Sequence, residues 1–162
     1  ANSIAGLGRV LAAGARLEFG PELGRSRAPH PRATAQGQGP FRVIWGLHAD
    51  TFEHATRSRF VEATFRVSAR MDRMGTRLDD PGGVFTGQRV LSLLSDAIVP
   101  GDIQILGDGT PIVLMRDHQP TGGYPRIATL VSADIDRFAQ LRPGSDVRFE
   151  PVTLKHALGL KP

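Results

Sequence analysis

The sequence contains no cysteine among its 162 residues. Disulfides, thiolate metal sites and a cysteine nucleophile are therefore excluded, and the composition fits a reducing compartment. No window approaches the roughly 18 uncharged apolar residues that a membrane helix needs. The N-terminal residues have no basic segment ahead of an apolar core, so they predict no signal peptide. We therefore expect a cytoplasmic protein without a membrane partner.

Aromatic side chains are scarce, with one tryptophan and one tyrosine. The formal net charge is +4 and the sequence pI is about 10.6, a basic balance that can indicate nucleic-acid binding. However, the arginines cluster only at Arg25, Arg27 and Arg32, and no basic stripe is interleaved with aromatic residues that would stack bases. We expect no nucleic-acid partner.

Motifs for metal and nucleotide chemistry are missing as well. The five histidines stand at no ligand spacing, and no HExxH or Cys/His cluster occurs, so we predict no metal site. The Gly-Asp-Gly of residues 107–109 is typical of a turn rather than a P-loop, so no ATP site is built wholly from this chain. No nucleophile-elbow motif is present, although a Ser-His-Asp triad needs no adjacent residues and stays open.

Short apolar segments separated by turns make up most of the chain. The hydrophobic fraction of 40% and the charged fraction of 22% are typical of a globular protein. Residues 61–69 alternate strictly between apolar and polar side chains, which predicts a half-buried strand. Further strands are predicted at residues 41–45, 89–94, 97–99, 103–106, 111–115, 127–131 and 146–150, and short helices at 51–55, 133–140 and 153–158. This pattern predicts an all-β barrel or sandwich.

Composition divides the chain into three parts. Residues 20–40 are rich in glycine, proline and small polar residues, which predicts a linker or a long surface loop. Residues 1–19 contain two short apolar runs, and residues 41–162 are predicted to form the main domain. The chain lacks an initiator methionine, so we expect a fragment or a processed chain.

A polar loop between two apolar strands is the main candidate for a functional site. Residues 117–127, which we call the central loop, read DHQPTGGYPRI and carry a carboxylate, an imidazole, an amide, a hydroxyl, a phenol and a guanidinium. The adjacent Gly122 and Gly123 allow a tight turn that brings backbone N–H groups near a ligand. Loops held by rigid strands concentrate binding and chemistry. The alternative is an ordinary Gly/Pro hairpin loop, which composition alone favours equally.

The segment around Gly75, which reads MDRMGTRL, is a second candidate. Asp72, Arg73 and Arg77 offer a charge relay that could hold an acidic ligand bidentately, and Gly75 implies a special backbone angle. The alternative is an Arg–Asp network that only braces a barrel rim. Arg126 also has two possible roles: it could bind an anionic ligand, or it could be an ordinary surface charge.

Five motifs occur in this order and at these spacings in one known family. They are MDRMGTRL at 71–78, LSDAIVPGDIQ at 94–104, GTPIVL at 109–114, DHQPTGGYPRI at 117–127 and AQLRPG at 139–144. On these motifs the chain resembles the allophanate hydrolase subunit 2 family, over about residues 41–155. Residues 1–19 are similar to the segment that precedes this half in the family. Members are usually much longer, so the chain resembles their C-terminal half.

The resemblance implies a cyclophilin-like β-barrel with two or three short helices. One branch is the C-subunit of 5-oxoprolinase, which implies a protein acting with a subunit-1-like (KipI-like) partner and an amidohydrolase-type subunit. That assembly uses ATP to hydrolyse the lactam of 5-oxoproline to glutamate. The alternatives are a biotin-dependent carboxyltransferase domain, as in urea carboxylase, and a non-catalytic KipA-like regulator that works by binding its partner.

The resemblance also implies a role for each residue of the candidate site. Asp117, Gln119 and Arg73 would be catalytic, with the first two orienting substrate nitrogen or oxygen. The substrate-binding residues would be Arg77, Thr121, Gly122, Gly123, Tyr124 and Arg126. The family loop usually has Thr where this chain has Pro120, which lacks a hydroxyl and a backbone N–H, and Lys where it has Arg126.

Overall fold

The computed structural model describes residues 12–16, 20, 39–87 and 93–160. The chain divides into two compact units, Ala1–Arg32 and Ala33–Pro162, and the helices and strands described below belong to the second. The predicted linker and the segment before it lie mostly outside the described residues, so those boundaries stay predictions. Within the described part of the chain, no helix is long and apolar enough to cross a membrane. The cytoplasmic location stays a prediction.

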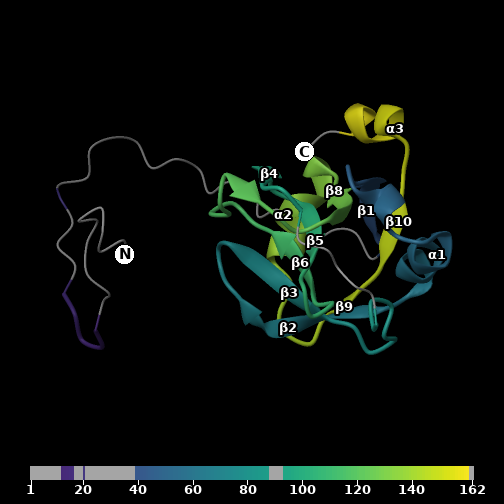
Figure 1. Cartoon of the computed structure of the whole chain (residues 1–162). Helices are drawn as coiled ribbons and strands as arrows, with labels where there is room; N and C mark the ends of the chain where they lie inside the picture. The colour runs from purple at the N-terminus through teal and green to yellow at the C-terminus, as the bar shows by residue number, and fades with distance from the viewer. Residues whose placement is uncertain (1–11, 17–19, 21–38, 88–92, 161–162) are drawn as a thin grey trace. The chain divides into compact units, whose positions relative to one another are not determined.

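The second unit is built around one sheet of eight strands (Figure 1). Across the sheet the strands run in the order β10 (Phe149–Pro151), β1 (Phe41–Trp45), β8 (Arg126–Leu130), β5 (Asp102–Ile105), β6 (Pro111–Leu114), β3 (Gly75–Asp79), β2 (Phe65–Met71) and β9 (Asp146–Val147). Neighbours are antiparallel except β1 and β10, which are parallel. The turn predicted at residues 107–109 is confirmed: it joins β5 and β6 as a hairpin, and the Gly109 N–H donates to the Leu106 carbonyl.

The two outer strands of this sheet belong to one short segment of chain. β9 pairs with β2, where Val147 lies opposite Phe65, and β10 pairs with β1, where Phe149 lies opposite Phe41. Between them, the Arg148 carbonyl accepts a hydrogen bond of 2.7 Å from the Phe41 N–H. The segment therefore joins both edges, and the sheet curls into a nearly closed barrel. This confirms the predicted all-β, cyclophilin-like barrel with two or three short helices.

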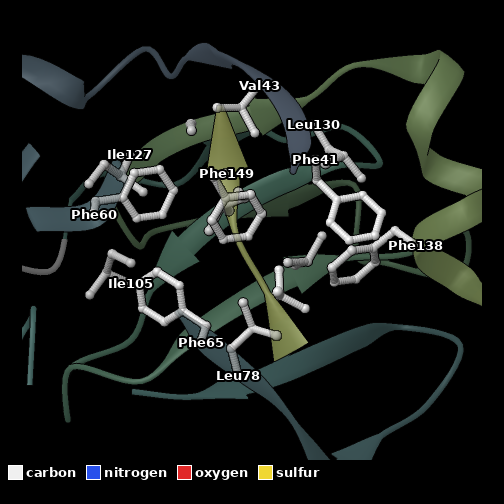
Figure 2. Packing of buried hydrophobic residues seen from close by; sticks show 14 of the residues in the cluster. Phe41, Val43, Phe60, Phe65, Leu78, Ile105, Ile127, Leu130, Phe138 and Phe149 are labelled. Carbon is white, nitrogen blue, oxygen red and sulfur yellow. The ribbon is translucent and has the colours of Figure 1, made fainter. Parts of the chain in front are cut away.

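Phenylalanine rings fill the interior of the barrel (Figure 2). Phe60 and Phe149 stack with ring centroids 4.9 Å apart, and Phe65 packs beside both. Phe138 of helix α2 (Ser132–Ala139) meets Phe41 edge-on at 5.2 Å. All five side chains are buried, and burying each one stabilises the fold by about 2 kcal/mol. The packed interior gives the outer face of the sheet a rigid support.

Helix α1 (His54–Glu62) occupies part of the stretch that the alternating pattern predicted to be a strand. The strand prediction for residues 61–69 was wrong over its first residues, because β2 begins only at Phe65. Phe60 reaches the core from the helix and is fully buried, and this burial outweighs a short alternating pattern. A register shift between β2 and β3 then leaves Ser68 buried, against the predicted alternation.

The remaining helices lie near their predicted positions. A 3-10 turn, η1 (Ala49–Thr51), stands where a helix was predicted to begin, so the helix predicted at 51–55 was placed too early. α2 begins at Ser132, one residue before the start of the helix predicted at 133–140. α3 (Leu154–Gly159) is capped by Thr153, whose hydroxyl accepts a hydrogen bond from a backbone N–H of the first turn.

A separate two-stranded ribbon pairs β4 (Asp96–Ala97) with β7 (Thr121–Gly122). The Ile98 N–H extends this pairing by donating to the Pro120 carbonyl at 3.2 Å. The ribbon therefore holds the central loop against the segment that precedes β5. The strand predicted at residues 89–94 lies mostly outside the described residues.

Candidate functional site

A row of side chains crosses the outer face of the barrel. The strand register places Arg77 of β3 opposite Ile112 of β6, and Ile112 opposite Gln104 of β5. Side chains at paired positions point to the same face of a sheet, and the adjacent Leu78 and Ile103 belong to the core. Arg77, Ile112 and Gln104 therefore face outward as neighbours.

The central loop lies over this row and forms a pocket of about 280 Å³, which we call the loop pocket. Six of the predicted site residues line it: Arg77, Gln119, Thr121, Gly122, Gly123 and Tyr124. The other described lining residues are Met74, Ser95, Ile98, Gln104, Leu106, Ile112, Leu114 and His118. The structure thus brings most of the predicted substrate-binding residues together, from the loop and from the sheet beneath it.

Arg77 carries the charge of the loop pocket. Among its described lining residues, no other is an arginine, lysine, aspartate or glutamate. None of the carboxylates in the described part of the chain forms an ion pair with its guanidinium. A guanidinium without a carboxylate partner, in a pocket whose lining also includes amide and hydroxyl groups, suits a small anionic ligand, because it offers several donors in a fixed plane.

Gly122 and Gly123 serve close packing rather than the predicted tight turn. Neither residue has a positive φ, and Gly122 lies within β7. A Cβ added at Gly122 would lie 2.7 Å from Gln104 Nε2, and one added at Gly123 would lie 2.9 Å from the Leu93 carbonyl oxygen. The missing side chains therefore let the loop backbone rest directly on the row and on the segment before β4.

Arg73 and Asp117, two of the three predicted catalytic residues, pair with each other outside the loop pocket. Arg73 Nε lies 2.8 Å from Asp117 Oδ2, and Nη2 donates to Oδ1 at 3.1 Å. Both side chains are exposed, and Arg73 borders a different hollow, beside Met71 and Met115. The third predicted catalytic residue, Gln119, is the one that lines the loop pocket.

Asp72 stabilises the turn between β2 and β3 instead of forming the predicted charge relay with Arg73 and Arg77. Its Oδ1 accepts hydrogen bonds of 2.8 and 3.1 Å from two backbone N–H groups of the turn. The special backbone angle predicted at Gly75 is absent, because its φ is not positive. A Cβ at Gly75 would instead lie 2.7 Å from Ile112 Cδ1. The glycine is needed because the isoleucine packs over it and forms part of the pocket floor.

Arg126 is buried, so it is not the surface charge that was one alternative. Its guanidinium lies 2.8 Å from Asp96 Oδ2 and 3.4 Å from Asp102 Oδ2, and it donates to the Ala97 carbonyl at 2.9 Å. These contacts tie β8 to β5 and to the ribbon. Burial and the nearby guanidinium hold the pKa of His48 below its usual value, and His48 Nδ1 accepts from the Arg126 N–H. Arg126 is not among the described lining residues of the loop pocket, and its substrate-binding role stays a prediction.

The family described as carboxyltransferase domain, subdomain A and B, matches residues 1–151. The chain belongs to this family. The C-subunit of 5-oxoprolinase from Escherichia coli (strain K12) is 35% identical to it over 159 residues, which cover 93% of this chain and 48% of the relative. The C-subunit of 5-oxoprolinase from Haemophilus influenzae is 42% identical over 120 residues, which cover 74% of this chain and 38% of the relative. The chain spans about half the length of these relatives, or less.

The crystal structure of Kluyveromyces lactis urea carboxylase has a TM-score of 0.65 to this carboxyltransferase-domain chain. The match is 23% identical and covers 74% of this chain and 11% of that one. At this identity the similarity concerns the fold alone. It agrees with the barrel, and the family match confirms the resemblance that the five motifs carry.

Gln104 is one of three polar lining residues of this carboxyltransferase-domain chain to which the sequence analysis assigned no role. It was assigned to a strand with no role of its own. The available signal was a single amide in the apolar run IQIL, at the position that points away from the core. The surroundings of the Gln104 side chain depend on the pairing of β5 with β6 and on the β4–β7 ribbon. Neither arrangement can be predicted from the residues next to Gln104 in the sequence. Ser95 and His118 line the pocket and were also not assigned a role.

Proposed function

We propose that this chain is the C-terminal part of a protein resembling the C-subunit of 5-oxoprolinase, in an assembly that uses ATP to hydrolyse the lactam of 5-oxoproline to glutamate. Relatives of that name, at 35% and 42% identity, support the proposal. The observation that carries it is Arg77, which forms no ion pair with any described residue and lines a pocket of about 280 Å³. 5-Oxoproline is a small ring that bears a carboxylate beside its lactam, and the guanidinium supplies the opposite charge.

The other groups around Arg77 suit such a substrate. Gln119 and Thr121 place an amide and a hydroxyl at the exposed rim, and Tyr124 adds a phenol. Ile112 gives the ring an apolar surface to rest on. Donors placed around an amide carbonyl stabilise the negative charge that develops on its oxygen when the bond is hydrolysed.

The remaining chemistry belongs to the assembly in this proposal. A subunit-1-like (KipI-like) partner would cover the exposed Arg73–Asp117 pair and bring it into a shared site, and an amidohydrolase-type subunit would complete the complex. In this proposal ATP would bind elsewhere in the assembly, and residues 107–110 of this chain form the β5–β6 turn. Within the described residues, no group of three or more His, Cys, Asp or Glu side chains is placed to hold a metal ion.

A biotin-dependent carboxyltransferase is the second candidate, favoured by the description of the matching family. Biotin would supply the carboxyl carrier. Gln119 and Thr121 would then face its ureido oxygen, and Arg77 the anionic carboxyl group that it carries. The two candidates use the same pocket and differ in the molecule that enters it.

The test measures ATP-dependent glutamate formation from 5-oxoproline by the native subunit assembled with its two partner subunits. Arg77→Met removes the charge of the pocket and should raise KM about tenfold or more, the loss expected for a charged hydrogen bond. Arg148→Met is the matched control, because Arg148 is exposed between β9 and β10 and is not among the lining residues of the loop pocket. It should leave KM unchanged.

A well-formed complex that makes no glutamate would contradict the hydrolase proposal. Carboxyl transfer from biotin by the same complex would then support the carboxyltransferase. Assembly with neither activity would favour a KipA-like regulator.

A further inference from the structure

We propose that Gln104 binds the substrate: its Nε2 donates a hydrogen bond to the carbonyl oxygen of the ligand whose carboxylate Arg77 holds. The inference rests on the proposed function and adds the residue that recognises the second polar end of the molecule. The ligand class is a compact molecule with a carboxylate at one end and an amide-type carbonyl at the other.

Gln104 Nε2 is buried without a hydrogen-bond partner. The residue is 4% exposed, and Nε2 forms no hydrogen bond with any group in the described part of the chain. An unpaired buried amide destabilises a fold, whereas an apolar side chain of similar length at the same place would not. When a buried amide beside a pocket has no hydrogen-bond partner in the protein, we expect the ligand to supply that partner.

The pairing of β5 with β8 is irregular at this same residue. Ile103 lies opposite Ala128, but Gln104 lies opposite Arg126, so the register shifts by one residue and Ile127 of β8 is the extra residue. Bulges of this kind re-aim a side chain and occur often beside functional sites. The shift is an observation of the backbone, independent of the missing hydrogen bond, and it occurs directly opposite Gln104.

Gly122 and Ile112 define where the amide lies. A Cβ at Gly122 would be 2.7 Å from Nε2, so the loop backbone packs directly on the amide at the pocket. In the row across the sheet, Ile112 separates Gln104 from Arg77, and two strand spacings put the Cα atoms of these two residues about 10 Å apart. Two long polar side chains on either side of an isoleucine leave a place for a small ring between their polar ends. All three side chains line the loop pocket.

The test uses three probes that carry different parts of the ligand. 5-Oxoproline has the carboxylate and the lactam carbonyl, and 2-pyrrolidinone has only the lactam carbonyl. Proline has the carboxylate and the ring without the carbonyl, and its ring nitrogen is a protonated amine. Binding to the native subunit is followed by NMR of the glutamine side-chain amides, and the Gln104 signal is identified as the one that disappears in Gln104→Met. We expect 5-oxoproline and 2-pyrrolidinone to shift this signal strongly, and proline to shift it little.

The variants separate the two ends of the ligand. Gln104→Met should raise the Kd of 5-oxoproline and of 2-pyrrolidinone about tenfold, the effect of one hydrogen bond, and should leave the Kd of proline unchanged. Arg77→Met should weaken 5-oxoproline and proline and spare 2-pyrrolidinone. Gln140→Met is the matched control, because Gln140 is an exposed glutamine at the end of α2 and should affect none of the three.

A purely structural role for Gln104 predicts a different result. In our proposal the melting temperature of Gln104→Met equals or exceeds that of the native protein, because the variant removes an unpaired buried amide. A lower melting temperature together with an equal loss of all three probes would assign Gln104 to packing and overturn the inference.

Failure of the inference and failure of the proposed function give different results. If 5-oxoproline binds and is hydrolysed while Gln104→Met leaves its Kd unchanged, Gln104 is not the donor and the hydrolase proposal stands. If the Gln104 signal responds to 2-imidazolidinone, the ureido ring of biotin, and not to 5-oxoproline, the donor role stands and the hydrolase proposal fails. If no probe moves the signal, the inference is overturned.

Discussion

Arg73 and Asp117 form a two-point ion pair between the β2–β3 turn and the first residue of the central loop, with Nε 2.8 Å from Oδ2 and Nη2 3.1 Å from Oδ1. Two backbone hydrogen bonds join the same two segments. The Asp117 N–H donates to the Arg73 carbonyl at 2.9 Å, and the Met115 N–H donates to the Met74 carbonyl at 2.9 Å. The start of the loop is therefore held by the turn, and its end by the buried Arg126. The central-loop residues that line the loop pocket lie between these two attachments.

Asp117→Ala and Arg73→Ala should each lower the free energy of unfolding by less than about 1 kcal/mol, because both side chains are exposed. In the assembled subunit the same changes should abolish glutamate formation if the two residues have their predicted catalytic roles. Urea denaturation and the turnover assay measure the two effects. Arg66→Ala is the control, since it breaks the similarly exposed Arg66–Asp146 pair away from the loop. Equal losses of turnover in all three variants would contradict a role specific to the Arg73–Asp117 pair.

Gly122→Ala should lower stability by about 1–3 kcal/mol, the usual effect of overpacking. Its Cβ would lie 2.7 Å from Gln104 Nε2 and 3.1 Å from Ile98 Cδ1, so the loop must lift or the amide must move. Ligand binding in the loop pocket should weaken as well. Gly107→Ala is the matched control, because a Cβ there meets nothing within 4 Å. Equal melting temperatures for the two variants would show that the loop is not packed tightly on the row.

Arg126→Leu should lower the free energy of unfolding by about 3–5 kcal/mol, the effect of removing one partner from a buried ion pair. The change leaves Asp102, whose side chain is 2% exposed, without its counter-charge. Arg126→Lys should recover only part of the loss, because an ammonium group cannot reach both carboxylates and the Ala97 carbonyl in the same plane. Denaturant titration measures all three proteins. A loss below about 1 kcal/mol for the leucine variant would mean that the pair contributes little to the attachment of the ribbon.

Asp134→Asn should destabilise the protein by about 2 kcal/mol at neutral pH, because the carboxylate accepts charged hydrogen bonds from Arg42. Burial alone would raise the pKa of Asp134, but hydrogen bonds from the side chain and backbone of Arg42 outweigh it and hold the pKa below its usual value. A carboxyl with a lower pKa in the folded state adds stability above its unfolded pKa of about 3.9, and this is lost as the pH falls through the folded pKa.

Melting temperatures between about pH 2 and pH 7 check this prediction. The difference between native protein and Asp134→Asn should be constant above about pH 5 and should shrink toward acid. A difference that grows on acidification would contradict the sign of the pKa shift.

The contrast between α1 and the central loop shows where local sequence information was sufficient. The hairpin of β5 and β6 follows from its turn residues, and the central loop from the polar run between two apolar strands. In contrast, residues 61–69 alternate like a strand, yet α1 runs into that stretch because Phe60 is buried in the core from a helix. Hydrophobic burial of one large ring is a non-local energy, and it outweighs a few residues of pattern.

Residues that are near each other in the chain specify the turns, most of the apolar strand segments and the polar groups of the central loop, so these could be predicted from the sequence. Which of those groups share a pocket depends on the tertiary structure. Strand register placed Gln104 and Arg77 on either side of Ile112, turned Arg126 into a buried brace, and left Arg73 and Asp117 outside. Register is set by the packing of the whole barrel, so side chains from strands far apart in the chain become neighbours that no local pattern predicts.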